Sequence, residues 1–366
     1  MSAETYGIKK KYYFWLDWIR LLSALAVVVC HVRGAVLPEY GELPPEQHNF
    51  IVFLFYTMTR MGADAVVCFF TLSGFLVGGK VLDGVLYHSF DFKRFMIGRF
   101  VRILPPLVFG LMLWVVLGSF YCTIQGPAIS LPLFVGNALG VNGILCQTAV
   151  GPYWALPYET WFYVIVGCLG GVVLIKKAGW RAIAVLGLLV GVWMYWHLEF
   201  SRLAIFTAGM LAHWLSGRFP AKRHMWVGAI IVFIMSIGVR MCASGSNAFA
   251  KLIPISCSSS LVLLGLSVAF LLWAISTRVP KNKLVSGFEA MGPRCAISTY
   301  SIFLTHMQFV WFLTYLGMRR YTYLGVQSVL VFVGVSLLVI VLGHCAYWCC
   351  EKHTGRLSRR MLELIG

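Results

Sequence analysis

Charge is the scarcest property of this sequence. Of its 366 residues only 12% are Asp, Glu, Lys or Arg, and only 13 are acidic, whereas 60% are hydrophobic. Soluble domains contain about 25% charged and about 45 to 50% apolar residues, so the composition excludes a water-soluble globular protein, a disordered chain and a fibrous one. The composition therefore predicts an all-α fold, a polytopic transmembrane helix bundle.

The apolar segments are numerous enough for about ten membrane spans. A helix needs roughly 20 apolar residues to cross the hydrocarbon core. Segments of this kind, separated by basic or Gly/Pro-rich breaks, lie at 16–37, 62–79, 103–121, 153–175, 182–200, 201–217, 225–242, 253–276, 295–316 and 325–350. The fifth and sixth are contiguous, which predicts a tight helical hairpin. A further apolar segment, 49–60, contains Arg60 and is expected to lie along the membrane interface.

The basic residues indicate the orientation of these spans. The formal net charge of +17 would suggest a nucleic-acid partner in a soluble protein. Here most Lys and Arg residues fall in alternate loops, which the positive-inside rule assigns to the cytoplasm. We therefore expect membrane lipids around the chain, no nucleic acid, and cytoplasmic segments at 1–15 and 351–366. Residues 1–366 are expected to form one membrane-embedded domain.

The 11 cysteines lie mostly inside predicted spans, where a thiol is simply a small apolar side chain. Cys122 and Cys146 differ, because both fall in the predicted outer loop between the third and fourth spans. They could form a disulfide in an oxidising compartment or stay reduced. The Cys and His spacings predict no metal site.

Besides Arg33 near its predicted outer end, the first predicted span carries three ionisable side chains, Asp17, Arg20 and His31. Arg20 and His31 are eleven positions apart, a rotation of about 1,100° that ends roughly 20° from three full turns. They therefore share a helix face and are about 16 Å apart along its axis. Asp17 precedes Arg20 by three residues, so it can hold the guanidinium. Alternatively, Arg20 extends to the inner headgroups and His31 bonds a neighbouring helix, which does not explain their common face.

Glu159 and His306 are further candidates among the ionisable side chains of later spans. Glu159 is about two turns below the outer end of the fourth span, at a depth close to that of His31. A carboxylate there could orient the histidine and stabilise its protonated form, or it could bond a Tyr or Trp in helix packing. His306 is in the middle of the ninth span, where a packing role and a catalytic role are both open.

A basic cluster precedes the third span on the predicted cytoplasmic side. It contains Lys93, Arg94, Arg99 and Arg102. Arg99 and Arg102 are one turn apart, so their guanidinium groups could grip the phosphates of a nucleotide-like ligand. The alternative is an anchor for anionic lipid headgroups.

These features occur together in the order typical of a known family. The motifs are Leu16 to Arg20 followed by His31, an aromatic segment ending in Ser73-Gly-Phe-Leu, Arg99-X-X-Arg102, Trp154 to Glu159 with Phe162-Tyr163, Tyr300 to His306, and Glu351. In this respect the chain resembles the acyltransferase-3 family of integral-membrane O-acyltransferases. It departs from the family pattern at Ala155, where Ser is common, and at Lys352-His353, which replaces a Glu-X-Pro ending.

The resemblance implies a function and roles for these residues. The function is transfer of an acyl group, usually acetyl, from cytoplasmic acyl-CoA to a hydroxyl of a bacterial surface polysaccharide or its lipid-linked precursor, in the cytoplasmic (inner) membrane. His31 would be the general base with Glu159 as its catalytic partner, and no metal or tightly bound cofactor is needed. The implied donor-binding residues are Arg20, Arg94, Arg99 and Arg102, and the supporting residues are Asp17, Ser73, Tyr300 and His306. Polysaccharide-assembly proteins are expected as further partners.

Alternatives to this function remain open at this level. Many family members carry an additional esterase-like soluble domain, whereas this chain is expected to act with its membrane domain alone. The acceptor could instead be a small molecule or a lipid. A non-catalytic transporter or flippase of a lipid-linked sugar would also line its passage with polar residues, but paired, Gly/Pro-broken spans in matching halves are not evident.

Overall fold

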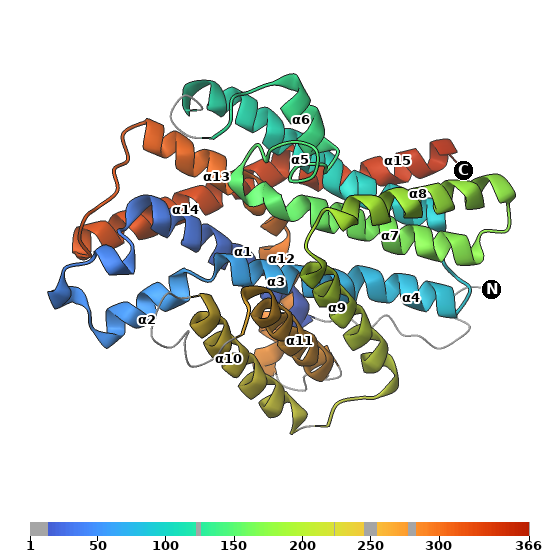
Figure 1. The fold of residues 1–366 in the computed structure, drawn as a ribbon, viewed down its shortest axis with the longest axis horizontal. Helices are drawn as coiled ribbons and strands as arrows, with labels where there is room; N and C mark the ends of the chain where they lie inside the picture. Colours follow the sequence, from blue (N-terminus) through green and yellow to red (C-terminus); the bar gives the residue numbers. More distant parts are fainter. Residues whose placement is uncertain (1–13, 122–125, 223, 245–254, 277–282, 366) are drawn as a thin grey trace. The chain divides into compact units, whose positions relative to one another are not determined.

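The computed structural model describes residues 14–121, 126–222, 224–244, 255–276 and 283–365, and nearly all of its ordered structure is helical (Figure 1). Among these residues the β pairing is limited to one isolated bridge between Asn142 and Cys146. The α-helices are α1 Phe14–Val36, α2 Phe50–Thr59, α3 Gly62–Ser73, α4 Gly79–Leu86, α5 Phe92–Tyr121, α6 Leu131–Ala138, α7 Leu156–Leu174, α8 Ala178–Trp196, α9 Phe200–Arg218, α10 Met225–Ser244, α11 Cys257–Ser276, α12 Lys283–Ala296, α13 Thr299–Tyr315, α14 Val326–Cys349 and α15 Thr354–Ile365. The shorter elements include the π-helix η4 (Gly74–Gly78) and the 3-10 helices η2 (Tyr40–Glu42), η3 (Pro45–Gln47), η5 (Gly151–Ala155) and η7 (Glu351–His353).

The all-α, membrane-spanning fold is confirmed. Eight segments in the described residues are long and apolar enough to cross a bilayer. They are Trp15–Glu42, Gly62–Leu86, Phe92–Tyr121, Gly151–Leu174, Ala178–Trp196, Met225–Ala243, Cys257–Ser276 and Val326–Leu364.

The two other predicted spans also form helices, but these are less suited to crossing. The prediction at 201–217 corresponds to α9, which carries Arg202, His213 and Arg218, and the prediction at 295–316 corresponds to α13, which has 17 residues. Segment 49–60 forms the 10-residue α2. The total of ten crossings, the orientation of α2 and the cytoplasmic position of both termini stay predictions.

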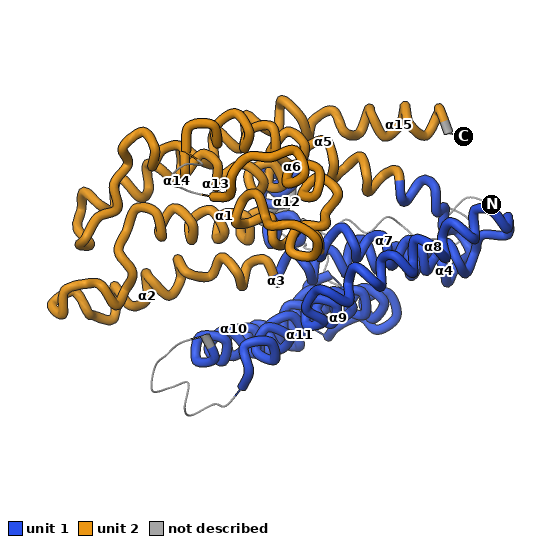
Figure 2. Tube along the Cα trace, turned by 45° about the horizontal axis from the view of Figure 1, so that its top comes forward, with its two compact units in different colours: residues 1–20, 67–96, 158–296 blue, residues 21–66, 97–157, 297–366 orange. Residues whose placement is uncertain are grey.

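The helices group into two compact units, each built from three separate stretches of sequence (Figure 2). Unit 1 comprises residues 1–20, 67–96 and 158–296, and unit 2 comprises residues 21–66, 97–157 and 297–366. Helices α1, α3, α5 and α7 contribute residues to both units.

In unit 1, α9 packs against α11 and against the α3–η4–α4 segment, and α10 packs against α11. The contact with α3 and η4 is made by backbone. A Cβ added at Gly74 would lie 1.9 Å from the carbonyl oxygen of Phe206, and one added at Gly209 would lie 2.1 Å from that of Thr71. Small residues commonly allow membrane helices to approach this closely, so glycine is required at both positions.

Unit 2 has an apolar core formed by α1, α13 and α14. Its members are buried β-branched, leucine and aromatic side chains: Val28, Val32, Val36, Leu37, Ile302, Val310, Phe332 and Val339. On α1 the valines recur every four residues, so they form one face of the helix. This core holds the C-terminal half of α1 and its histidine in a defined rotation against α13.

Candidate active site

The N-terminal end of α1 carries the predicted ion pair. Nη1 of Arg20 lies 3.2 Å from Oδ1 of Asp17, and both side chains are largely buried. The spacing of three residues places these groups one turn apart on the same helix. The prediction that Asp17 holds the Arg20 guanidinium is therefore confirmed.

His31, on α1, contacts His306, on α13, within unit 2. Nε2 of His306 lies 3.2 Å from Nδ1 of His31, and the ring centroids are 5.0 Å apart. His306 is fully buried, whereas His31 is half-buried. Sequence reasoning left the role of His306 open, and the structure places it as the direct partner of the candidate base.

Backbone carbonyl groups determine which nitrogen of each ring carries the proton. Nδ1 of His31 lies 2.9 Å from the carbonyl oxygen of Val27, and Nδ1 of His306 lies 2.8 Å from that of Phe303. A carbonyl oxygen only accepts, so both Nδ1 atoms are assigned as N–H donors in the neutral rings. Nε2 of His306 then accepts from the Nδ1–H of His31.

The second ring nitrogen of His31 is consequently a lone-pair site. Within the described part of the chain its Nε2 has no hydrogen-bond partner. A half-buried imidazole with one nitrogen fixed as a donor and the other available as an acceptor is the arrangement of a general base.

Glu159 lies in unit 1, at the start of α7, with Ser73 of α3. The Ser73 hydroxyl donates to Oε1 of Glu159 over 3.4 Å, and the Tyr163 hydroxyl donates to the same oxygen. The Ser73 and Tyr163 oxygens are 3.2 Å apart. Glu159 thus bonds a tyrosine of its own helix and a serine of α3, and whether its role is catalytic or structural stays a prediction. Because His31 belongs to unit 2, its pairing with Glu159 stays a prediction.

The predicted donor-binding arginines lie in the first turns of α5. Arg94 and Arg102 are exposed, and Arg99 is half-buried. The backbone N–H of Arg94 donates to Oδ1 of Asp91 over 3.0 Å, which caps the helix. Nearby, the Lys93 ammonium lies 4.7 Å from the centroid of the Trp180 ring. Both interpretations of this cluster, a phosphate clamp and a lipid anchor, stay predictions.

The remaining candidates lie in unit 2. Tyr300 is half-buried on α13, and the adjacent Ser301 donates its N–H and its hydroxyl to Oε2 of Glu351, over 3.2 and 2.6 Å. Cys146 is half-buried next to Asn137, and burial raises the pKa of its thiol. Cys122 lies outside the described residues, so the disulfide stays a prediction, as does the absence of a metal or tightly bound cofactor.

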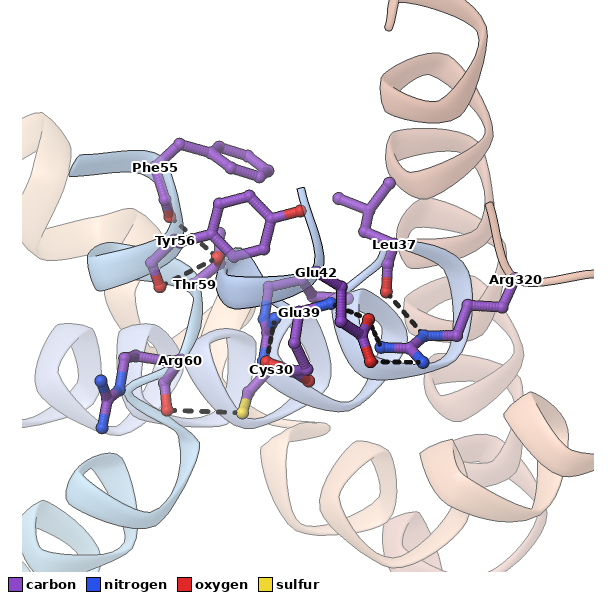
Figure 3. A network of polar contacts seen from close by, with 10 residues as sticks. Cys30, Leu37, Glu39, Glu42, Phe55, Tyr56, Thr59, Arg60 and Arg320 are labelled. Carbon is purple, nitrogen blue, oxygen red and sulfur yellow. Dashed lines mark hydrogen bonds and ion pairs between the residues drawn. The ribbon is translucent and has the colours of Figure 1, made fainter. Parts of the chain in front are cut away.

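Sequence reasoning missed a polar network at the end of α1, two residues beyond His31 (Figure 3). Arg33, whose side chain is only 8% exposed, pairs with Glu39 over 3.0 Å. Arg320 pairs with Glu42 over 2.7 Å and donates from Nε to the carbonyl oxygen of Leu37 over 3.0 Å. Two glutamates three positions apart in a chain with 13 acidic residues were the available signal. The network ties the segment after α1 to the segment after α13.

A second missed cluster joins η5 to α13 inside unit 2. The fully buried Tyr153 hydroxyl donates to the carbonyl oxygen of Leu304 over 2.9 Å and accepts from Nε2 of Gln308 over 2.8 Å. A Cβ at Gly110 would lie 2.4 Å from that hydroxyl. The cluster fixes α13 on both sides of His306.

Comparison with known proteins identifies the family. A family model described as an acyltransferase domain, Acyl_transf_3, matches residues 13–348. No curated protein and no solved structure matches the chain. The family match covers nearly all of the helical, membrane-spanning chain described above. The chain therefore belongs to the acyltransferase-3 family and is a multi-pass membrane acyltransferase.

Proposed function

We propose that the protein is an O-acyltransferase of the bacterial cytoplasmic membrane. It moves an acyl group, acetyl in the simplest case, from cytoplasmic acyl-CoA to a hydroxyl of a surface polysaccharide or its lipid-linked precursor. The observation that carries this proposal is the geometry of His31, whose Nδ1 is held by Val27 and His306 and whose Nε2 keeps its lone pair. We propose polysaccharide-assembly proteins as partners because the chain belongs to the acyltransferase-3 family.

The role of His31 follows from the chemistry of the acceptor. A sugar hydroxyl is a weak nucleophile until a base removes its proton, and a positioned histidine contributes about 10²- to 10⁴-fold to such steps. His31 lies six residues before the end of the predicted span at Leu37, about 9 Å along the helix. An acceptor arriving from the outer side would meet it near the surface.

The role of the arginines follows from the chemistry of the donor. The phosphates of CoA require cations, and planar guanidinium groups bind them with paired hydrogen bonds. Arg94, Arg99 and Arg102 lie together on α5 at the predicted cytoplasmic side, and Arg20 is on the same helix as His31. The separation of Arg20 and His31 by eleven residues, about 16 Å along a helix, is of the order of a pantetheine arm.

The alternative acceptors, a small molecule or a lipid, would use the same base and donor site. Deletion of the gene distinguishes these acceptors from a polysaccharide. We expect one surface polysaccharide of the deletion strain to lose its O-acyl groups. Loss of acylation from a lipid or a small molecule, with every polysaccharide unchanged, would redirect the proposal.

The catalytic proposal is tested with protein purified into lipid, radiolabelled acetyl-CoA and candidate glycans. We expect His31→Ala to reduce transfer by about 10²- to 10⁴-fold. His197→Ala is the matched control, because Nδ1 of His197 also lies 3.0 Å from the carbonyl oxygen four residues earlier, at an exposed helix end. Full transfer by a folded His31→Ala protein would rule out His31 as the base.

A further inference from the structure

The last helix of unit 2, α15 (Thr354–Ile365), is strongly amphipathic (Figure 2). Leu357, Met361 and Leu364 follow one another at intervals of four and three residues, so they share one face of the helix. Leu357 is 41% exposed and Leu364 is 85% exposed. Within the described elements, α15 packs chiefly against η7, the segment immediately before it. Two of the three apolar side chains on this face are thus left uncovered by the described part of the chain.

The adjoining side of α15 is basic. Arg356, Arg359 and Arg360 are all exposed, and Glu363 is the one acidic residue in the sequence of the helix. At about 100° per residue, Arg360 is roughly 40° from Leu364 around the helix axis, so the basic side borders the apolar face. A helix with leucines on one face and arginines beside it is typical of helices that lie in the plane of a membrane interface.

The end of α14 places the start of α15 at the membrane surface. The exposed side chains of α14 before this end are apolar: Leu330, Val333, Leu337, Leu338 and Val341. Trp348 is 52% exposed, and the Lys352 ammonium lies 3.8 Å from the centroid of its ring. Tryptophan and lysine at the end of a span are typical of the level of the lipid headgroups. Thr354 begins α15 two residues after Lys352, so α15 begins at this level.

The bilayer interface satisfies both sides of α15, whereas water satisfies only one. The helix has 12 residues, and isolated helices of this length are marginal in water. In water its exposed leucines would also stay hydrated. In the interface the leucines are buried at the boundary of the acyl chains, and the arginines reach the headgroup phosphates. Three arginines against one glutamate favour an anionic surface, because each basic residue near such a surface strengthens binding about fivefold.

We propose that α15 is a lipid-binding helix, which lies in the bilayer interface with its arginines on the headgroups of anionic phospholipids. Lipid covers the face formed by Leu357, Met361 and Leu364, in place of another protein or a second copy of this chain. The inference is independent of the acyl-transfer chemistry, because no residue of the candidate active site takes part in it.

Hydrogen exchange tests the proposal on the full-length protein. The protein is placed at one copy per nanodisc, in discs of phosphatidylcholine alone and in discs of equal parts phosphatidylcholine and phosphatidylglycerol. Exchange of the backbone amides of residues 354–365 is followed by mass spectrometry. We expect exchange to be slower in the anionic discs by about 30-fold, the product of about fivefold for each of two net positive charges. Equal exchange of this segment in the two kinds of disc would overturn the proposal.

Charge variants of α15 should move this difference in both directions. The combination of Arg356→Gln, Arg359→Gln and Arg360→Gln should abolish the slowing by anionic lipid. Glu363→Gln should increase the slowing about fivefold further, because it removes the one opposing charge. A gain of protection cannot result from misfolding. Slowing that persists in the triple variant, or that does not increase in Glu363→Gln, would contradict the role of the arginines.

A matched control separates the local charge of α15 from the net charge of the protein. Lys176, Lys177 and Arg181 are exposed and lie on another segment. Their combined replacement by Gln changes the net charge by the same amount as the α15 triple variant. This control should keep the wild-type difference between the two kinds of disc. Loss of the difference in the control would show that it does not arise from α15.

The apolar face is tested separately. Leu357→Ser combined with Leu364→Ser should speed exchange of residues 354–365 in both kinds of disc, because the helix then has little apolar surface to bury in lipid. Unchanged protection in this variant would show that lipid does not cover the face. Protection that ignores lipid charge and increases when discs hold two copies would assign the face to a second copy of the chain and would overturn the proposal.

Discussion

Replacing His306 by leucine should slow acyl transfer about tenfold without abolishing it. Nε2 of His306 accepts from Nδ1–H of His31 over 3.2 Å, and His306 is fully buried. Leucine has a comparable size and no acceptor, so the change removes this hydrogen bond while largely filling the space. His31 would keep its bond to the Val27 carbonyl oxygen.

The magnitude follows from the change in charge on His31 during the reaction. Before proton transfer the ring is neutral, and a neutral hydrogen bond contributes about 0.5 to 1.5 kcal/mol. In the transition state the ring becomes cationic, and a hydrogen bond to a charged group contributes about 1.5 to 3 kcal/mol. Only the difference, about 1 to 1.5 kcal/mol, lowers the barrier. Since about 1.4 kcal/mol corresponds to tenfold in rate, kcat should fall about 5- to 13-fold.

The assay is transfer of radiolabelled acetyl to acceptor, with kcat measured at saturating acyl-CoA. His306→Gln should recover part of the loss, because its amide oxygen can accept near the original Nε2 position. Thr305→Val is the control on the same helix, since within the described ranges its hydroxyl bonds only the carbonyl oxygen of Ser301. A rate within twofold of wild type in His306→Leu would show that His306 does not stabilise the protonated base. A loss as large as that of His31→Ala would show that His306 is itself essential.

Three further predictions concern the proposed donor site, the packing of α13 and the loop between α6 and η5. Arg99→Ala combined with Arg102→Ala should raise KM for acyl-CoA at least about tenfold, because each charge-assisted hydrogen bond contributes about 1.5 to 3 kcal/mol. Arg181→Ala is the control and should leave this KM unchanged. An unchanged KM in the double variant would favour the lipid anchor. Tyr153→Phe should lower the free energy of unfolding by about 1 to 3 kcal/mol, since it leaves the buried Leu304 carbonyl oxygen without its donor; an unchanged thermal midpoint in detergent would contradict this. Because burial raises the pKa of the Cys146 thiol, alkylation of Cys146 in the reduced protein should reach half of its plateau at a higher pH than alkylation of free cysteine does. A midpoint at or below that of free cysteine would refute the burial of this thiol.

Much of the fold follows from properties that are local in sequence. The scarcity of charge and the length of the apolar segments identify the spans, because a bilayer imposes both requirements on each helix separately. The Asp17–Arg20 pair could also be predicted, since both residues lie on one turn of one helix. The shortness of α13 could not, because its polar Ser, His and Gln side chains bond residues of other elements that sequence spacing does not identify.

The candidate site was harder to predict because its contacts join distant parts of the chain. His31 and His306 are 275 positions apart, and Ser73 and Glu159 are 86 apart. Sequence spacing says which face of a helix a residue occupies but not which helix faces it. Glu159 was accordingly expected to serve His31, whereas its observed partners are Ser73 and Tyr163. The Arg33–Glu39 pair depends on a turn through Pro38 that no helical periodicity describes.

The backbone contact between α9 and the α3–η4 segment also bears on how the protein is made. Gly74 lies against Phe206, about 130 residues later in the chain. At synthesis rates of about 5 to 20 residues per second, roughly 7 to 26 s pass between the emergence of the two. During that interval lipid or an insertion factor must cover a glycine surface that offers no side chains for contact. A helix other than α9 could pack against this glycine surface first. Correct assembly of the fold therefore depends on the order in which the helices leave the ribosome.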